Sequence, residues 1–145
     1  MYRAGGSVDS PAVPQKRPRV PANCDLWLGL QCVDKSEPGV SVWTMTPGSH
    51  MENPAGAVQG GLLTALADTA MAAAAVTASE YRMFVANTDL AVSFLRPART
   101  GETLTCRARV IGTGDGVMFV EATITAPDDR LVTRASSTYV LTPRG

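Results

Sequence analysis

The sequence lacks the long apolar runs that membrane insertion needs. Asp68 interrupts the best stretch, so no run of about 18 or more apolar residues exists and a transmembrane helix is not expected. The N-terminus also lacks the apolar core of a signal peptide. Positive and negative charges balance at 13 each, so no net field favours nucleic acid or an anionic membrane. These absences together predict a soluble protein of the cytoplasm.

Cysteine and histidine are also scarce. The three cysteines are scattered without C-x-x-C spacing, which fits neither a disulfide framework nor a zinc site and favours reduced thiols. His50 is the only histidine. We therefore expect no metal, because the ligand types and spacings of a metal site are absent.

Proline is concentrated at one end. Residues 1–22 hold four of the ten prolines, with Lys16, Arg17 and Arg19 among them, and this density of prolines prevents both helices and central strands. We expect residues 1–22 to form a flexible tail, and residues 23–145 to form one domain of ordinary size.

The remaining pattern alternates between strands and one helix. A helix is expected from about Gly60 to Ala78, where alanine and leucine dominate. Six segments are expected to be strands, the first of them either a strand or a short entry from helix to strand. They are 26–33, 40–45, 84–95, 102–111, 117–125 and 131–141. Polar and apolar residues alternate in 102–111, which is typical of an antiparallel sheet with one wet face. The order predicts an α+β fold, an antiparallel sheet of about five to six strands wrapped around one long central helix.

Asp68 is the most informative residue of this helix. The surrounding residues are apolar on nearly every face, which predicts a buried helix and a desolvated carboxylate. No Lys, Arg or His occurs from position 51 to 81, so the carboxylate has no local cationic partner. Such a group is a candidate for chemistry, although a neutral buried Asp or one that caps a backbone group is the alternative. Two glycines in the first helical turn, Gly60 and Gly61, are poor helix formers and suggest close approach by a ligand, with simple turn geometry as the alternative.

The segment before the helix carries a family resemblance. Asn53-Pro54-Ala55-Gly56-Ala57-Val58-Gln59-Gly60-Gly61, followed seven positions later by Asp68, resembles the motif of hotdog-fold acyl-CoA thioesterases. The closest type is the phenylacetate-degradation (PaaI-like) and 4-hydroxybenzoyl-CoA thioesterase branch. The later Phe94-Leu95-Arg96-Pro97 resembles a turn of the same family. The resemblance covers about residues 26–142.

The resemblance implies hydrolysis of an acyl-CoA without any cofactor, coenzyme A being part of the substrate. Asp68 corresponds to the catalytic carboxylate, as nucleophile or general base, and Gly60 to the backbone N–H that polarises the thioester carbonyl. Asn53 corresponds to a loop amide near the carbonyl, with an Asx turn as the alternative. Thr88 is slightly favoured over Asn87 as the residue that holds the attacking water. The implied substrate contacts further include Gly61, Asn87, Arg96 and Arg99, the two arginines as phosphate ligands or as members of a solvated turn.

Helix geometry then predicts the oligomer. Eight residues separate Gly60 from Asp68, so they lie ~12 Å apart along one helix. A single carbonyl needs both groups within ~3 Å, which one helix cannot provide. Two antiparallel helices from two subunits can, so we expect a homodimer with two composite sites, which can pair further into a homotetramer.

Gln59 departs from the family pattern, which has histidine there. Glutamine can hydrogen-bond but cannot act as acid or base, which disfavours a hydratase built on that histidine. Two alternatives to a thioesterase stay open. One is a non-catalytic hotdog protein that binds acyl-CoA as a sensor or store, and the other is a structural dimer with a degenerate pocket.

Overall fold

The computed structural model describes residues 21–144, so most of the expected tail, residues 1–20, lies outside the described part. Two α-helices, a short 3-10 helix and seven strands follow in the order α1, β1, β2, η1, α2, β3, β4, β5, β6 and β7. Their bounds are α1 Asn23–Leu28, β1 Gln31–Asp34, β2 Val40–Met45, η1 Ser49–Met51, α2 Gly60–Ala78, β3 Met83–Asn87, β4 Ala91–Phe94, β5 Leu104–Gly114, β6 Val117–Thr125 and β7 Leu131–Pro143.

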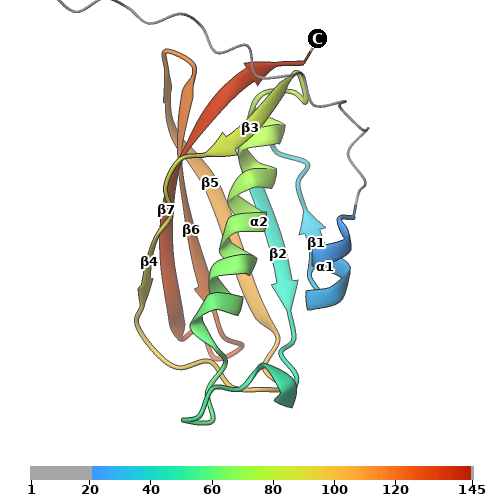
Figure 1. The fold of residues 1–145 in the computed structure, drawn as a ribbon, viewed down its shortest axis with the longest axis vertical. Helices are drawn as coiled ribbons and strands as arrows, with labels where there is room; N and C mark the ends of the chain where they lie inside the picture. The colour runs from blue at the N-terminus through green and yellow to red at the C-terminus, as the bar shows by residue number, and fades with distance from the viewer. Residues whose placement is uncertain (1–20, 145) are drawn as a thin grey trace, which may run out of the picture.

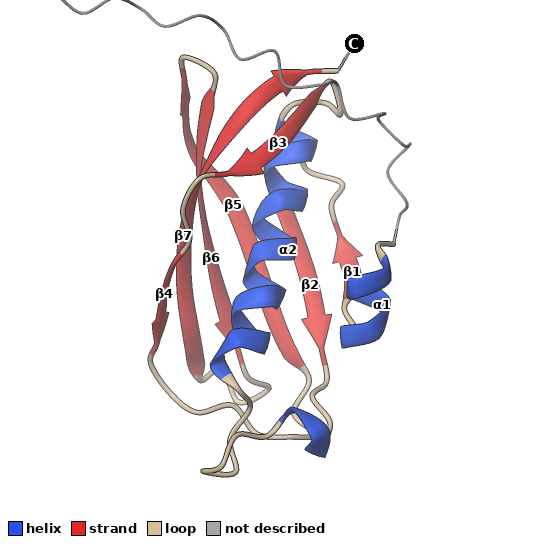
Figure 2. Ribbon diagram, in the orientation of Figure 1, coloured by secondary structure: helices blue, strands red, loops and turns tan. Residues whose placement is uncertain are grey.

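The seven strands form one antiparallel sheet in the order β1-β2-β5-β6-β7-β3, with β4 also paired to β7. Figure 1 shows the sheet curling around α2, with α1 lying outside β1 at one edge. Figure 2 shows that the strands form a single layer behind α2, which is the expected α+β arrangement. The sheet has one strand more than the upper end of the expected range, because the segment expected as 84–95 is divided.

That division occurs at the turn between β3 and β4. Both strands pair with β7, but Asp89 lies between them and accepts two hydrogen bonds from that strand. Its side chain accepts from the Thr138 N–H at 2.7 Å, and its carbonyl accepts from the Ser137 hydroxyl at 2.6 Å. These contacts take the place of regular strand pairing and bend the chain. The single continuous strand was therefore a wrong prediction.

Residues 26–33 comprise the end of α1 followed by β1, which confirms the helix-to-strand alternative for this segment. One other boundary differs locally. The break expected at 112–116 shrinks to a two-residue turn, since β5 continues to Gly114. Asp115 and Gly116 have φ of 48° and 79°, the left-handed values that a tight type I′ hairpin turn requires.

The core is formed where α2 meets the sheet. Its buried side chains recur every three or four residues, as expected for one helix face. They are Leu63, Leu66, Ala67, Ala70, Met71, Ala74 and Ala75. By length and composition α2 is also the one described helix that could cross a membrane, but here this face packs against β2, β5 and β6 as the core helix.

The opposite face of α2 corrects a prediction. Asp68, Thr69, Ala72, Ala73 and Val76 are only half-buried in the single chain. The helix was expected to be enclosed on all sides because its outer face is also largely apolar. Composition does not reveal which side the sheet covers, so the expected complete desolvation of Asp68 does not hold for one chain alone.

Candidate active site

The loop that leads into α2 is held by Asn53. Its Oδ1 accepts hydrogen bonds from the backbone N–H groups of Ala55 at 2.9 Å and Ala57 at 3.1 Å. Gly56 closes the turn with a φ of 76°, in the region that favours glycine. This is the Asx-turn alternative, so the Asn53 side-chain oxygen serves the loop. Its amide nitrogen is the part that a ligand can use.

The helix begins at Gly60 without a side-chain cap. Gln59 is the N-cap residue, is exposed, and makes no capping hydrogen bond with its side chain. The first N–H groups of a helix have no partner inside the helix, and they carry the positive end of its dipole. The start of α2 therefore offers donors to an anion or a polarised carbonyl.

Phe94 supplies a local reason for one of the two glycines. A Cβ added at Gly60 would lie 3.0 Å from the Phe94 Cζ, tighter than nine in ten real Cβ contacts, whereas a Cβ at Gly61 would meet nothing within 4 Å. Sequence reasoning offered ligand approach or simple turn geometry for the two glycines and missed the aromatic ring that lies against the first. The signal was present, because Phe94 belongs to the turn that carries the family resemblance.

A cavity of about 370 Å³ lies beside this helix start. Gly60, Asn53, Phe94 and Arg96 line it. The Arg96 guanidinium also donates to the Leu131 carbonyl at 3.2 Å. Arg99 does not line the cavity; its backbone N–H donates to Glu102. Of the two predicted arginines, the structure thus brings only Arg96 to the start of α2.

Asp68 lies two turns further along α2, on its half-buried face. Asn87 at the end of β3 donates from its Nδ2 to the Asp68 Oδ1 at 2.9 Å. The Tyr139 hydroxyl lies 3.5 Å from the same oxygen. Burial, and after it the negative charge of Asp68, raise the pKa of Tyr139, so this hydroxyl keeps its proton. Both donors lie at Oδ1, and no described group donates to the other oxygen of this carboxylate.

Asn87 and Thr88 have different surroundings. Thr88 donates from its backbone N–H and, more weakly, from its hydroxyl to the Thr138 carbonyl, at 2.9 Å and 3.4 Å. The described contacts therefore join Asn87, rather than Thr88, to Asp68. Tyr139 was missed from the sequence altogether, because its contact with Asp68 depends on how β7 curls over α2.

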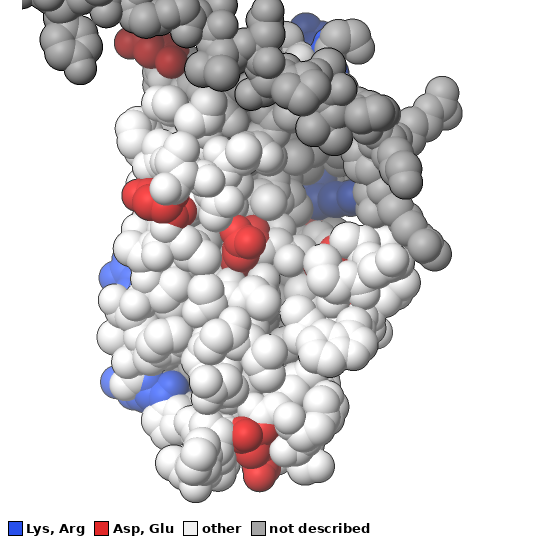
Figure 3. All heavy atoms as spheres, viewed as in Figure 1, with Lys and Arg blue, Asp and Glu red and all other residues white. Residues whose placement is uncertain are grey.

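One chain keeps the two halves of the predicted site apart. Gly60 and Asp68 lie on the same unbroken helix and line different cavities, the second of about 530 Å³. Figure 3 shows that the α2 side of the molecule is mostly uncharged, with isolated acidic and basic groups.

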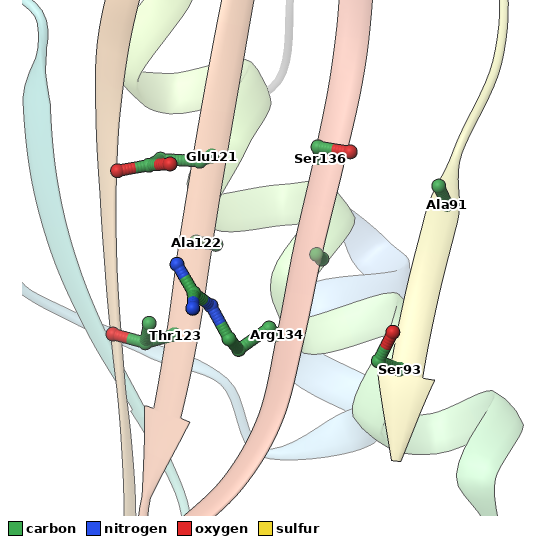
Figure 4. Close-up of a pocket in the computed structure, with 8 residues that line it drawn as sticks. Ala91, Ser93, Glu121, Ala122, Thr123, Arg134 and Ser136 are labelled. Carbon is green, nitrogen blue, oxygen red and sulfur yellow. The ribbon is translucent and has the colours of Figure 1, made fainter. Parts of the chain in front are cut away.

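The opposite face of the sheet holds another cavity, of about 360 Å³. Figure 4 shows Glu121, Thr123 and Arg134 projecting there from β6 and β7, beside Ala91 and Ser93 of β4. None of the predicted site residues lines this cavity. Within residues 21–144 no three His, Cys, Asp or Glu side chains gather to hold a metal ion.

Solved structures share this architecture. The PaaI protein of Escherichia coli, from the phenylacetic acid degradation operon, is 27% identical, with 86% of each chain covered and a TM-score of 0.78. Thioesterase HI1161 of Haemophilus influenzae is 25% identical over 83% of this chain and 82% of that one, with a TM-score of 0.76. The protein smu.793 of Streptococcus mutans, solved with acetyl-CoA, is 20% identical over 91% and 98%, with a TM-score of 0.75.

These likenesses confirm the predicted hotdog fold of the PaaI-like type. No curated protein matches the chain significantly. The family model of the thioesterase superfamily matches residues 55–133, which is more than half of the chain and includes both the α2 start and Asp68. The chain therefore belongs to the thioesterase superfamily.

Proposed function

We propose that the protein is a cytoplasmic thioesterase that hydrolyses acyl-CoA to a free acid and coenzyme A. Membership of the thioesterase superfamily supports thioester chemistry in general. The neighbour solved with acetyl-CoA supports a coenzyme A ligand for this fold. The observation that carries the proposal is the Asp68 carboxylate, which lies on the open face of α2 and is held by Asn87 rather than by a cation.

In the proposed reaction the thioester carbonyl oxygen accepts a hydrogen bond from the N–H of Gly60, at the positive end of the helix dipole. In one route Asp68 takes a proton from water as the water oxygen bonds to the carbonyl carbon, and the carbon–sulfur bond then breaks. In the other route Asp68 attacks that carbon itself, the carbon–sulfur bond breaks as the anhydride forms, and water then cleaves the anhydride. In both routes coenzyme A leaves as the thiolate and takes up a proton, and the acid is released. Both routes give the same products.

The remaining predicted residues have supporting roles in this scheme. Asn53 and Gln59 shape the loop before α2, and Gly61 lets the substrate approach the helix start. Arg96 is placed to meet a phosphate of coenzyme A, because a guanidinium binds phosphate through paired donors. Thr88, which directly follows Asn87 in the chain, is proposed to contact the attacking water.

The proposal requires two subunits. Gly60 and Asp68 are about 12 Å apart on one helix, too far to serve one carbonyl. The outer face of α2 is half-buried, and near the helix start it carries the small side chain of Ala65, which suits close packing of a second helix. In an antiparallel pair, Gly60 of the partner subunit meets Asp68 of the first, and the reverse holds at the second site.

Turnover of an acyl-CoA panel tests the proposal, with released coenzyme A followed by a thiol reagent. We expect Asp68→Asn to lower kcat at least about a hundredfold, the size typical of a lost general base. Asp115→Asn, in the β5–β6 turn, is the matched control and should leave kcat unchanged. Equal turnover by native protein and Asp68→Asn would refute a catalytic role for Asp68.

Gln59 favours a second candidate, a protein that binds acyl-CoA without cleaving it. Its exposed amide replaces the family histidine and makes no capping hydrogen bond. Calorimetric binding of acyl-CoA with no release of coenzyme A, in native protein and Asp68→Asn alike, would favour this candidate. Absence of both binding and turnover would leave a structural dimer.

A further inference from the structure

The cavity of about 530 Å³ on the α1 side of α2 has no role in the reaction described so far. It lies within the size range of small-molecule sites, roughly 300–1,000 Å³. Asp68 is part of its wall, together with Asp25 of α1 and Trp43 of β2. A thioester placed at Asp68 can therefore extend its acyl group into this space.

The walls leave room for such a group. Along α2 the cavity is lined by Thr69, Ala72, Ala73 and Val76, which are small side chains on successive turns. Trp43, which is 93% buried, closes the inner side. An apolar acyl body fits these walls, because burying apolar surface is favourable and no bulky side chain fills the space.

Asp25 is the unusual member of the wall. It is only 8% exposed, yet no Lys or Arg of residues 21–144 forms an ion pair with it. Its Oδ1 accepts from the Thr69 hydroxyl at 3.1 Å and lies 3.8 Å from the Cys24 sulfur. Buried carboxylates normally have their acceptor capacity filled.

The second oxygen of Asp25 is left for a ligand. No described side chain or backbone N–H donates to Oδ2. In the described chain the fully enclosed polar atoms without a partner are Trp43 Nε1, Arg130 Nε and Thr133 Oγ1, so Oδ2 keeps some accessible surface. Thr69 directly follows Asp68, and its hydrogen bond to Asp25 keeps this acceptor in the same cavity as the proposed reaction centre.

The cations of the cavity have other positions. Lys35 is exposed at the rim. The Arg144 guanidinium lies 4.8 Å above the Phe84 ring, and its Nε donates to the Met83 carbonyl. The acceptor at the inner wall is thus a carboxylate, which favours a ligand with a hydrogen-bond donor over one with a second carboxylate.

We propose that this cavity is the acyl-binding chamber and that Asp25 Oδ2 selects acyl groups carrying a hydroxyl remote from the thioester. The inference rests on the proposed function, because it assumes that the thioester lies at Asp68. A hydroxyl donates to the carboxylate, whereas a plain acyl group leaves that oxygen without a donor. Discrimination then arises from a buried polar group left unpaired.

The test compares 6-hydroxyhexanoyl-CoA with hexanoyl-CoA, with adipoyl-CoA as the charged analogue. For the native protein we expect kcat/KM to favour the hydroxylated substrate by roughly tenfold or more, the factor that one hydrogen bond to a charged group provides. Asp25→Asn should reduce this preference severalfold, chiefly through KM. If Asp25 has a purely structural role, Asp25→Asn should lower kcat/KM for the hydroxylated and the plain substrate together and leave the ratio of the two unchanged.

A second variant, on α2, tests the chamber without changing α1, whose docking Asp25→Asn can disturb. Ala72→Leu narrows the chamber from α2, and we expect it to lower kcat/KM for hexanoyl-CoA relative to acetyl-CoA by roughly tenfold, the loss expected for a misfitting methylene or two. Ala91→Leu, on the other face of the sheet, is the control and should leave kcat/KM unchanged for both hexanoyl-CoA and acetyl-CoA. An unchanged hexanoyl-to-acetyl ratio in Ala72→Leu would place the acyl group elsewhere.

The outcomes separate this inference from the proposed function. If coenzyme A is not released, the same pairs are compared by calorimetric Kd, so that binding still reports the hydroxyl preference while the hydrolytic function fails. A native ratio near one, a ratio unaltered by Asp25→Asn, or a preference for adipoyl-CoA overturns the inference even where hydrolysis is rapid. Absence of any acyl-CoA binding overturns both.

Discussion

Replacing Gly60 and Gly61 separately by alanine tests which of the two positions requires glycine for packing and which merely tolerates it. Neither residue has a positive φ, so alanine fits the backbone at both positions. Alanine is a better helix former than glycine by about 0.8–1.0 kcal/mol in a helix interior. On helix propensity alone, both substitutions should stabilise the protein slightly.

Phe94 makes the two positions differ. At Gly60 the new Cβ would lie 3.0 Å from the ring Cζ and 3.1 Å from Cε1. The ring is 54% exposed and can shift outward, so the cost is at the low end of overpacking, about 1 kcal/mol. Gly60→Ala should therefore leave the free energy of unfolding near its native value. Gly61→Ala, with open space around it, should gain about 0.5–1 kcal/mol.

Activity should separate the two variants more strongly. A displaced Phe94 disturbs the helix start that is proposed to polarise the thioester, and small displacements can cost up to about a hundredfold in rate. We expect Gly60→Ala to lower kcat roughly tenfold, within that limit, and Gly61→Ala to lower it far less. Urea unfolding and acyl-CoA kinetics on both variants, with and without Phe94→Leu, measure the coupling. Equal stabilities and equal rates, with no coupling to Phe94→Leu, would refute this account of the helix start.

Three further predictions follow from the surroundings of Asp68 and α2. Asn87→Ala, which removes the donor 2.9 Å from Asp68, should lower kcat roughly tenfold more than Thr88→Val in steady-state assays; a larger effect at Thr88 would contradict it. The raised pKa of Tyr139 stabilises the fold below pH about 10, and this contribution is lost as pH rises further. Tyr139→Phe should therefore flatten the decline of the unfolding free energy at alkaline pH. Burial raises the pKa of Cys106 to about 12, so this thiol makes the same contribution in both proteins. An unchanged slope in Tyr139→Phe would count against the role given to Tyr139. Met71→Ala, at a position with 0% exposure, should cost about 2–5 kcal/mol in urea unfolding, and more than Met83→Ala at the half-buried start of β3.

Local patterns predicted most of the fold. The bounds of α2 agree with the structure at both ends, because a run of alanine and leucine between glycines and Ser79 has few alternatives. Alternation in 102–111 predicted the buried face of β5. The division between β3 and β4 was not predictable, since it depends on hydrogen bonds that Asp89 accepts from residues of β7 about 48 positions away.

The candidate site, like the fold, was predicted where the pattern is local and missed where it depends on distant segments. The motif identified Asp68, Gly60 and Asn53, because their spacing is set within one loop and one helix. Tyr139, Asp25 and the Phe94 ring were missed, since each reaches the site from a distant segment. The open face of α2 was also missed, because composition shows that a helix is apolar without showing which side the sheet covers.

Mixing two inactive variants tests the shared site most directly. Asp68→Asn lacks the carboxylate, and Gly60→Pro lacks the N–H at the first helical position, where proline is tolerated. After subunit exchange in equal amounts, half of the dimers are mixed and each has one intact site, so about a quarter of native activity should return. Recovery to that level would support carboxylate and amide donor coming from different subunits. No recovery, with exchange verified by native mass spectrometry, would contradict the central claim.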